Sequence, residues 1–131
     1  MKVLVDTCVW SQVLRHKPAH SQLAQKLTGL IQEGRVVIIG PIRQELLSGI
    51  SHNHQFNQLK EHIAYFEDIP LQTEHFEKAA EFSNLWMQKG IQGSTIAFLI
   101  CAVAFLEDCM IFTTDKDFEN YKKHLPLKLI K

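Results

Sequence analysis

The run Val3-Leu4-Val5-Asp6, near the beginning of the chain, decides the fold class. Three consecutive apolar residues without apolar–polar alternation are typical of a short strand that is buried on both faces. Asp6 interrupts the apolar run and therefore stands at the carboxyl end of the predicted strand. Two similar runs, Val36-Val37-Ile38-Ile39 and Met110-Ile111-Phe112-Thr113, predict further strands of the same kind.

Helical patterns occupy the segments between the first strands. A short helix is expected to follow the first strand and to run through Trp10. Ser21 is expected to cap a second helix, and Gly34 stands where a C-terminal glycine belongs. Gly40-Pro41 begins a third helix, since proline is tolerated in a first helical turn. This order of strands and helices predicts a parallel sheet with right-handed crossovers.

The second half of the chain is richer in helices. Residues 53–66 and 73–89 are expected to form an antiparallel helix pair, residues 94–107 a nearly all-apolar helix, residues 115–124 a short helix and residues 127–130 a final edge strand. The face of the helix over 73–89 that is expected to be apolar carries Phe76, Ala79, Ala80, Ser83, Trp86 and Met87. The whole pattern predicts an α/β domain with a central parallel sheet of about 4–5 strands and helices on both faces.

Composition and charge narrow the class of protein. A chain of 131 residues, 46% hydrophobic and 21% charged, is expected to form one soluble domain over residues 1–131. The formal net charge is +0, so a nucleic-acid partner would have to meet a local basic surface. Asp6 breaks the first apolar run, and no window approaches the ~20 apolar residues of a membrane helix. A cytoplasmic protein without a membrane partner is therefore expected.

Cysteine and histidine residues do not suggest a zinc site. Cys8, Cys101 and Cys109 have apolar neighbours and no C-x-x-C spacing, so reduced, buried thiols are expected. The stretch His52-Asn53-His54 is expected to be a solvated loop, because no further ligand stands at a zinc-like spacing.

Acidic side chains follow three of the predicted elements at the same edge of the sheet. Asp6 comes after the first strand, Glu45 lies in the helix after the second, and Asp115 comes after the third. Asp117 lies close enough in sequence to join them. In open α/β sheets ligands bind outside the carboxyl ends of the strands, so these acids are candidate catalytic residues.

A cluster of this kind favours a hard divalent cation. Two carboxylates ~4 Å apart repel by about 4 kcal/mol at an effective dielectric of 20, and a bound cation removes that penalty. Oxygen ligands select Mg²⁺ or Mn²⁺, which activate water for attack on a phosphodiester. Each acid also has a simpler interpretation: Asp6 and Asp115 as helix caps, Asp117 as a first-turn acid, Glu45 as a solvated charge.

Three stretches resemble the motifs of PIN domains. Val3-Leu4-Val5-Asp6-Thr7 resembles their opening motif, residues 42–49 their glutamate-bearing helix, and Thr114-Asp115-Lys116-Asp117-Phe118 their closing T-D-x-D-F. The similarity covers essentially the whole chain and extends to the VapC toxins of type II toxin–antitoxin systems. The resemblance implies a PIN-like fold and a metal-dependent endoribonuclease that cuts RNA such as tRNA or rRNA.

The resemblance implies a metal site with one ligand missing. It assigns Asp6 and an acid at position 97 as principal ligands, with Asp115 or Asp117 completing the site and Glu45 beside it. The family motif D-x-L-I-A-A-x-A reads here from Ala97 to Ala104, so an alanine stands in the place of the expected metal ligand. Weak metal binding is expected, either in a natural pseudoenzyme or in a deliberately disarmed nuclease, and we favour the second hypothesis.

The expected partners also follow from the resemblance. VapC toxins imply a homodimer and a small antitoxin whose segment packs into an apolar groove, here expected beside the helices over 53–66 and 73–89. Arg15 and Lys116 are candidate contacts for RNA phosphates. The main alternative is a non-catalytic PIN-fold module that binds RNA or protein. A PIN enzyme for RNA processing or structured DNA, and a phosphatase or small-molecule hydrolase, are more distant alternatives.

Overall fold

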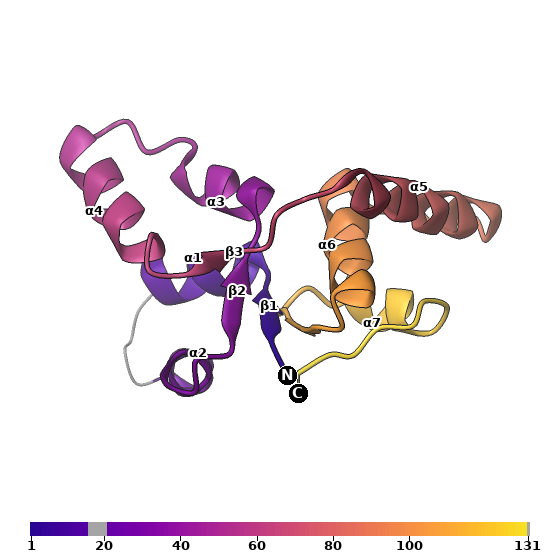
Figure 1. Ribbon diagram of the computed structural model, residues 1–131, viewed down its shortest axis with the longest axis horizontal. Helices are drawn as coiled ribbons and strands as arrows, with labels where there is room; N and C mark the ends of the chain where they lie inside the picture. The colour runs from indigo at the N-terminus through magenta and orange to yellow at the C-terminus, as the bar shows by residue number, and fades with distance from the viewer. Residues whose placement is uncertain (16–20, 131) are drawn as a thin grey trace.

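Four parallel strands form the centre of the molecule (Figure 1). The computed structural model describes residues 1–15 and 21–130, with Arg15 as backbone only. The strands are β1 (Val3–Val5), β2 (Val36–Ile38), β3 (Glu67–Asp68) and β4 (Met110–Phe112), in the order β3-β2-β1-β4. The predicted α/β class and parallel sheet are therefore confirmed.

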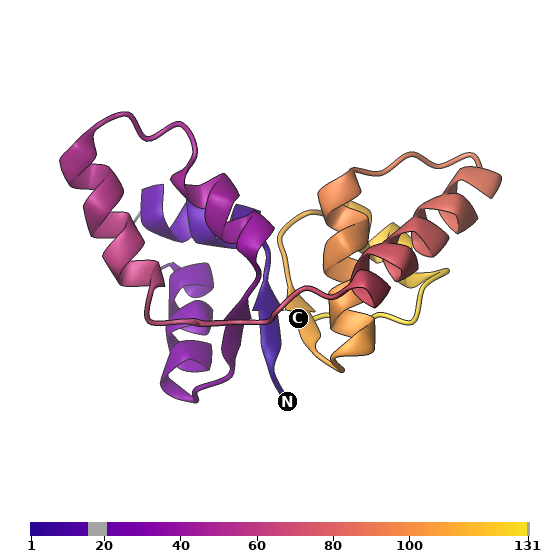
Figure 2. The same ribbon diagram turned by 45° about the horizontal axis from the view of Figure 1, so that its top comes forward.

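Helices flank this sheet in two groups (Figures 1 and 2). In both views helices α1 to α4 lie to the left of β1, and α5 to α7 lie to its right. Their bounds are α1 (Thr7–Arg15), α2 (Gln22–Gln32), α3 (Gly40–Leu47), α4 (Asn53–Ile63), α5 (Thr73–Gln88), α6 (Thr95–Leu106) and α7 (Asp117–Lys122).

The register of the strands places their carboxyl ends together. Val3 pairs with both Val36 and Met110, and Val5 pairs with Phe112. Strands β1 and β2 are fully buried, as expected for strands covered on both faces. The backbone N–H of Asp6 donates to the carbonyl of Phe112 (2.9 Å), which extends the pairing to the point where the acids begin.

Local signals fix the ends of the helices as predicted. The Ser21 hydroxyl accepts the N–H of Ala24 at 3.1 Å, which satisfies one free donor of the first turn of α2. Gly34 adopts φ +70°, a left-handed conformation that glycine tolerates, and turns the chain from α2 into β2.

The predicted antiparallel pairing of the helices over 53–66 and 73–89 is wrong. Helix α4 packs against α3, whereas α5 packs against α6 on the other side of the sheet. The short strand β3, which was not predicted, separates them by pairing with β2. Arg43 on α3 holds this connection, because its guanidinium donates to the carbonyl of Ile63 (2.9 Å) and to the carboxylate of Asp68 (2.8 Å).

The face of α5 that was expected to be apolar is only partly the buried one. Phe76 and Met87 are 52% and 64% exposed, whereas Phe82, Trp86 and His75 are buried. His75 takes a core position because both ring nitrogens have partners: Nδ1 accepts the N–H of Gln72 (2.8 Å), and Nε2 lies 3.0 Å from the Glu107 carboxylate. A prediction of the buried face from the spacing of apolar residues misses a histidine whose ring nitrogens both have hydrogen-bond partners.

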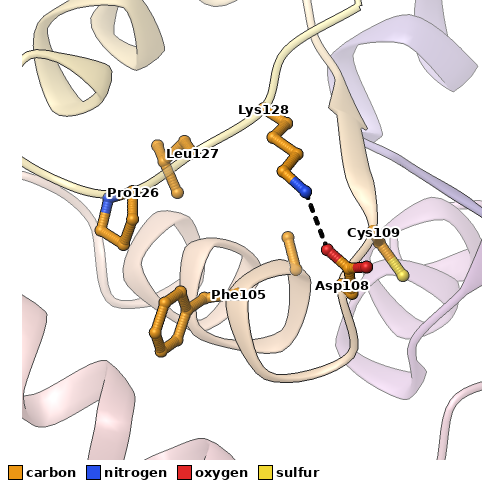
Figure 3. Close-up of a pocket in the computed structure, with 7 residues that line it drawn as sticks. Phe105, Asp108, Cys109, Pro126, Leu127 and Lys128 are labelled. Atoms are coloured by element: carbon orange, nitrogen blue, oxygen red, sulfur yellow. Dashed lines mark hydrogen bonds and ion pairs between the residues drawn. The ribbon is translucent and has the colours of Figure 1, made fainter.

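The predicted final edge strand is reduced to one bridge. Leu129 pairs in parallel with Ile111, and Lys128 forms an ion pair with Asp108 at 2.9 Å. Figure 3 shows this pair beside a pocket of about 190 Å³. Because Asp108 precedes β4, this pocket lies at the opposite end of the strand from the acids. In the described ranges no helix has the length and apolar character to span a membrane.

Candidate functional site

Asp6 is held in one orientation at the carboxyl end of β1. Its carbonyl accepts the N–H of Trp10 at 3.4 Å, so Asp6 directly precedes α1, and its Oδ1 accepts the N–H of Thr7, the first residue of that helix, at 2.8 Å. Its Oδ2 accepts the Thr113 hydroxyl at 2.8 Å and the Cys8 thiol at 3.4 Å. Asp6 is half-buried, so this carboxylate is a fixed acceptor at the edge of the sheet.

Thr113 connects Asp6 to the other two aspartates of the closing motif. The Thr113 hydroxyl donates to Asp6 and accepts the backbone N–H of Asp115 at 3.0 Å. The Asp115 carboxylate in turn accepts the N–H of Asp117 at 2.9 Å, at the beginning of α7. Asp115 and Asp117 are exposed; Asp115 lies near enough to Asp6 for its charge to raise the pKa of Asp6, and Asp117 is joined to Asp115.

The surroundings of Asp6 disfavour the charged form of its carboxyl group. Burial raises the pKa of Asp6 above its ordinary value of 3.8, and the charge of Asp115 adds to this rise. The hydrogen bonds from Thr113, Cys8 and Thr7 oppose it but do not reverse it. The charged form of Asp6 is therefore less favourable in the folded chain than in the unfolded one.

This rise predicts that Asp6→Asn stabilises the metal-free chain at neutral pH. With a higher pKa in the folded state, the folded chain binds more protons than the unfolded chain, so the parent loses stability as pH rises through the folded pKa. Urea unfolding between pH 4 and 8 should show the gain at pH 7 and its loss toward pH 3.8. Thr113→Val, which removes a donor to Asp6, should instead destabilise; an Asp6→Asn protein weaker than the parent at pH 7 would contradict the electrostatic argument.

Position 97 lies in the first turn of α6. Ala97 is 5% exposed, and its N–H is donated to the Ser94 hydroxyl at 3.1 Å, the first half of a capping box. Cys101 follows one turn later on the same face. Burial raises the pKa of Cys101 to about 12, and the charge of Asp6 contributes to that rise. Because Cys101 is near enough to be affected by the charge of Asp6, we expect a side chain one turn earlier on the same face to point toward the same acid; the chain has only a methyl group there.

The remaining predicted residues are not joined to this cluster. Glu45 is exposed on α3 and makes no hydrogen bond or ion pair to the other acids within the described ranges. Lys116 is exposed beside α7. The side chain of Arg15 lies outside the described residues.

The residues present do not fit a resident divalent metal. Among residues 1–14 and 21–130, no three His, Cys, Asp or Glu side chains lie where they could hold one ion together. Asp6 already accepts three hydrogen bonds, and Ala97 offers no oxygen. The site therefore lacks an oxygen ligand at position 97, where the sequence departs from the PIN motif.

Sequence reasoning missed Thr113 and Cys8 as members of the site. Thr113 was counted as the last residue of a strand, and Cys8 as a buried thiol, although Cys8 is half-buried and accepts the N–H of Thr114 at 3.4 Å. The sequence did contain a signal for Thr113, because it is a polar residue directly after an apolar run. It follows Phe112, which pairs with Val5, and therefore stands beside Asp6. All three cysteines are free thiols.

Fold and site together define an α/β protein that gathers acidic side chains at the carboxyl edge of a parallel sheet. The profile of the PIN domain family matches residues 3–124. The chain belongs to the PIN domain family, whose members are generally nucleases. No match is found among curated proteins.

Solved structures share this fold over nearly the whole chain. VapBC2 from Rickettsia felis, bound to a DNA fragment from its promoter, has a TM-score of 0.81 at 20% identity and covers 99% of this chain and 98% of its own. FitAcB from Neisseria gonorrhoeae scores 0.79 at 19% identity, with 98% and 96% covered. A toxin–antitoxin complex from Klebsiella pneumoniae scores 0.70 at 16% identity, with 99% and 97% covered. At these identities the likeness concerns the fold.

Proposed function

We propose that this chain is a VapC-type toxin: a single-domain endoribonuclease, dependent on Mg²⁺ or Mn²⁺, that is impaired because Ala97 replaces a metal ligand. The observation that carries the proposal is the Thr113-linked group of Asp6, Asp115 and Asp117, with the methyl group of Ala97 on the facing helix. An acid at position 97 would add the missing oxygen ligand, and oxygen ligands suit these two cations.

The substrate we propose is RNA, such as tRNA or rRNA. The acids would hold the metal, with Glu45 on α3 as an outlying carboxylate at the same edge of the sheet. Lys116 is exposed beside α7 and is our candidate for a phosphate contact, together with Arg15. Metal-dependent cutting of a tRNA and rRNA pool by the Ala97→Asp protein, read on a denaturing gel, tests this proposal.

For the antitoxin we propose a groove between α1, α3 and α4. It has a volume of about 690 Å³, and its apolar lining includes Leu14, Leu46, Ile50 and Leu59. The rest of its lining is mostly polar, with Gln55 and His62 among it, and no Asp, Glu, Lys or Arg of the described residues lines it, so an amphipathic segment of a small protein fits it. This replaces the groove expected between the two helices that proved to lie apart. Toxin–antitoxin complexes are among the structures with this fold.

A homodimer in the cytoplasm completes the proposal. Phe76 is 52% exposed beside a pocket of about 270 Å³ between α5 and α6, which Ala79, Ala80 and Leu99 also line. An exposed aromatic ring next to an apolar pocket suits a self-complementary contact.

The second candidate is a PIN-fold module that binds RNA or protein without cutting. The missing carboxylate at position 97 favours it, because the described residues contain no complete metal-ligand group. RNA binding without cutting by the Ala97→Asp protein would favour this candidate.

A further inference from the structure

The hydroxyl group of Tyr121 is a polar group at the edge of the acidic cluster that the site described above does not use. Tyr121 lies on α7, and only 3% of the residue is exposed. Its ring is packed by the rings of Trp86 (5.3 Å between centroids), Phe118 (5.3 Å) and Phe98 (5.5 Å). The ring is therefore held in one place by aromatic contacts from three elements.

The hydroxyl has no partner in the part of the chain that the structure describes. No hydrogen bond joins Tyr121 Oη to a side chain or a backbone group there. The sealed side-chain atoms without a partner in the described ranges are Thr7 Oγ1, Trp10 Nε1 and Trp86 Nε1. Tyr121 Oη is not among them, so the oxygen keeps a narrow contact with solvent although the residue is only 3% exposed. Such a donor is free to bind a ligand that replaces the solvent there.

The position of this hydroxyl is at the entrance to α6. A side-chain carbon built on Gly93 would lie 2.8 Å from Tyr121 Oη and 2.6 Å from Phe98 Cζ. Gly93 directly precedes Ser94, whose hydroxyl caps α6 and accepts the N–H of Ala97. The hydroxyl thus lies against the backbone that leads into α6, four residues before Ala97, and a side chain larger than that of glycine at position 93 would displace it.

The surroundings keep the phenol a hydrogen-bond donor. Burial raises the pKa of Tyr121 to about 12, and the charges of Asp117 and Asp115 contribute to the rise. A neutral O–H donor near carboxylates can bind a phosphate oxygen without adding to the negative charge of the cluster.

We propose that the Tyr121 hydroxyl contacts the nucleic-acid substrate, donating a hydrogen bond to a phosphate oxygen of RNA bound over the acidic cluster. This inference rests on the proposed function and adds a substrate-contacting residue to it. The contact is neutral, and it therefore differs from the charged contact assigned to Lys116.

Tyr121→Phe tests this contact with a closely matched control. We would measure the affinity of fluorescein-labelled total tRNA by anisotropy, using the chain with Ala97 so that cutting does not interfere. Tyr121→Phe should bind about tenfold more weakly, as expected for one lost hydrogen bond to a charged group. Tyr65→Phe makes the same chemical change at a residue that is 73% exposed between α4 and β3, and it should bind like the parent.

Two further readouts separate contact from structure. Because the hydroxyl has no internal partner, the Tm of Tyr121→Phe should not fall. The slope of log Kd against log salt should stay at the parent value in Tyr121→Phe and should drop by about one in Lys116→Gln, since only the lysine releases a counterion. Gly93→Ala keeps the hydroxyl but displaces it, and should also weaken binding.

Each outcome decides a different claim. If Tyr121→Phe binds tRNA within twofold of the parent, the inference is wrong and the nuclease proposal stands. If the parent does not bind tRNA and the Ala97→Asp protein leaves it uncut, the inference and the proposed function both fail.

Discussion

Ala97→Asp is expected to bind divalent metal and to become strongly dependent on it for stability. The new carboxylate would join Asp6, Asp115 and Asp117, so without metal the added like charge should lower the Tm below that of the parent. At a Mn²⁺ concentration 100 times Kd, binding adds about 2.7 kcal/mol, which is about 10 °C for a domain of this size. Thermal melts with Mg²⁺, Mn²⁺ or chelator measure both effects.

Two variants show whether the effect belongs to position 97. Ala97→Asn places a side chain of similar shape there without a charge, and its melting should respond weakly to metal. Ala64→Asp adds the same charge at an exposed site just after α4, and should not respond. A Tm of Ala97→Asp that ignores both Mg²⁺ and Mn²⁺ would contradict the metal-site interpretation.

Trp86→Ala is expected to cost about 3–5 kcal/mol of unfolding free energy, the usual range for a large aromatic residue lost from a core. Trp86 is completely buried on α5, and its ring contacts Tyr121 on α7 (5.3 Å) and His124 beyond it (4.9 Å). The cavity would loosen the packing of α7, which begins at Asp117. Urea unfolding followed by circular dichroism gives the change in free energy.

The indole N–H provides a control for this prediction. Trp86 Nε1 is sealed and has no partner among the described residues, and such a donor costs about 1–3 kcal/mol. Trp86→Phe removes that cost together with some volume, so it should destabilise much less than Trp86→Ala. Phe105→Ala, at a position 42% exposed, should also be mild. A Trp86→Ala protein within 1 kcal/mol of the parent would show that this cluster does not support α7.

Local sequence patterns predicted much of the fold, because a buried strand or a capped helix is specified by a few neighbouring residues. The runs that begin at Val3, Val36 and Met110 became β1, β2 and β4, and Ser21 caps α2. The separation of α4 from α5 could not be predicted in this way. It depends on Arg43, which joins α3 to the end of α4 and to β3, and such a contact between distant residues leaves no periodic signal.

The site was predictable at the level of residue types and strand ends. The positions of Asp6 and Asp115 after parallel strands indicated that they would approach each other, and the Thr113 hydroxyl joins them. Their roles, and that of Glu45, remain predictions. Tyr121 carried no signal in the sequence, because an aromatic residue on a short helix is usually core. Its unpartnered hydroxyl is visible only in three dimensions.

The most direct test of the central claim is RNA cleavage by this chain and by its Ala97→Asp variant. Both would be incubated with a total tRNA and rRNA pool in Mg²⁺, Mn²⁺ or chelator, and the products separated on a denaturing gel. We predict discrete, metal-dependent cuts by Ala97→Asp and cleavage at least about 100-fold slower by the parent, as for loss of a group that stabilises the transition state. Intact RNA with both proteins, in both metals, would contradict the assignment of this chain as a disarmed ribonuclease.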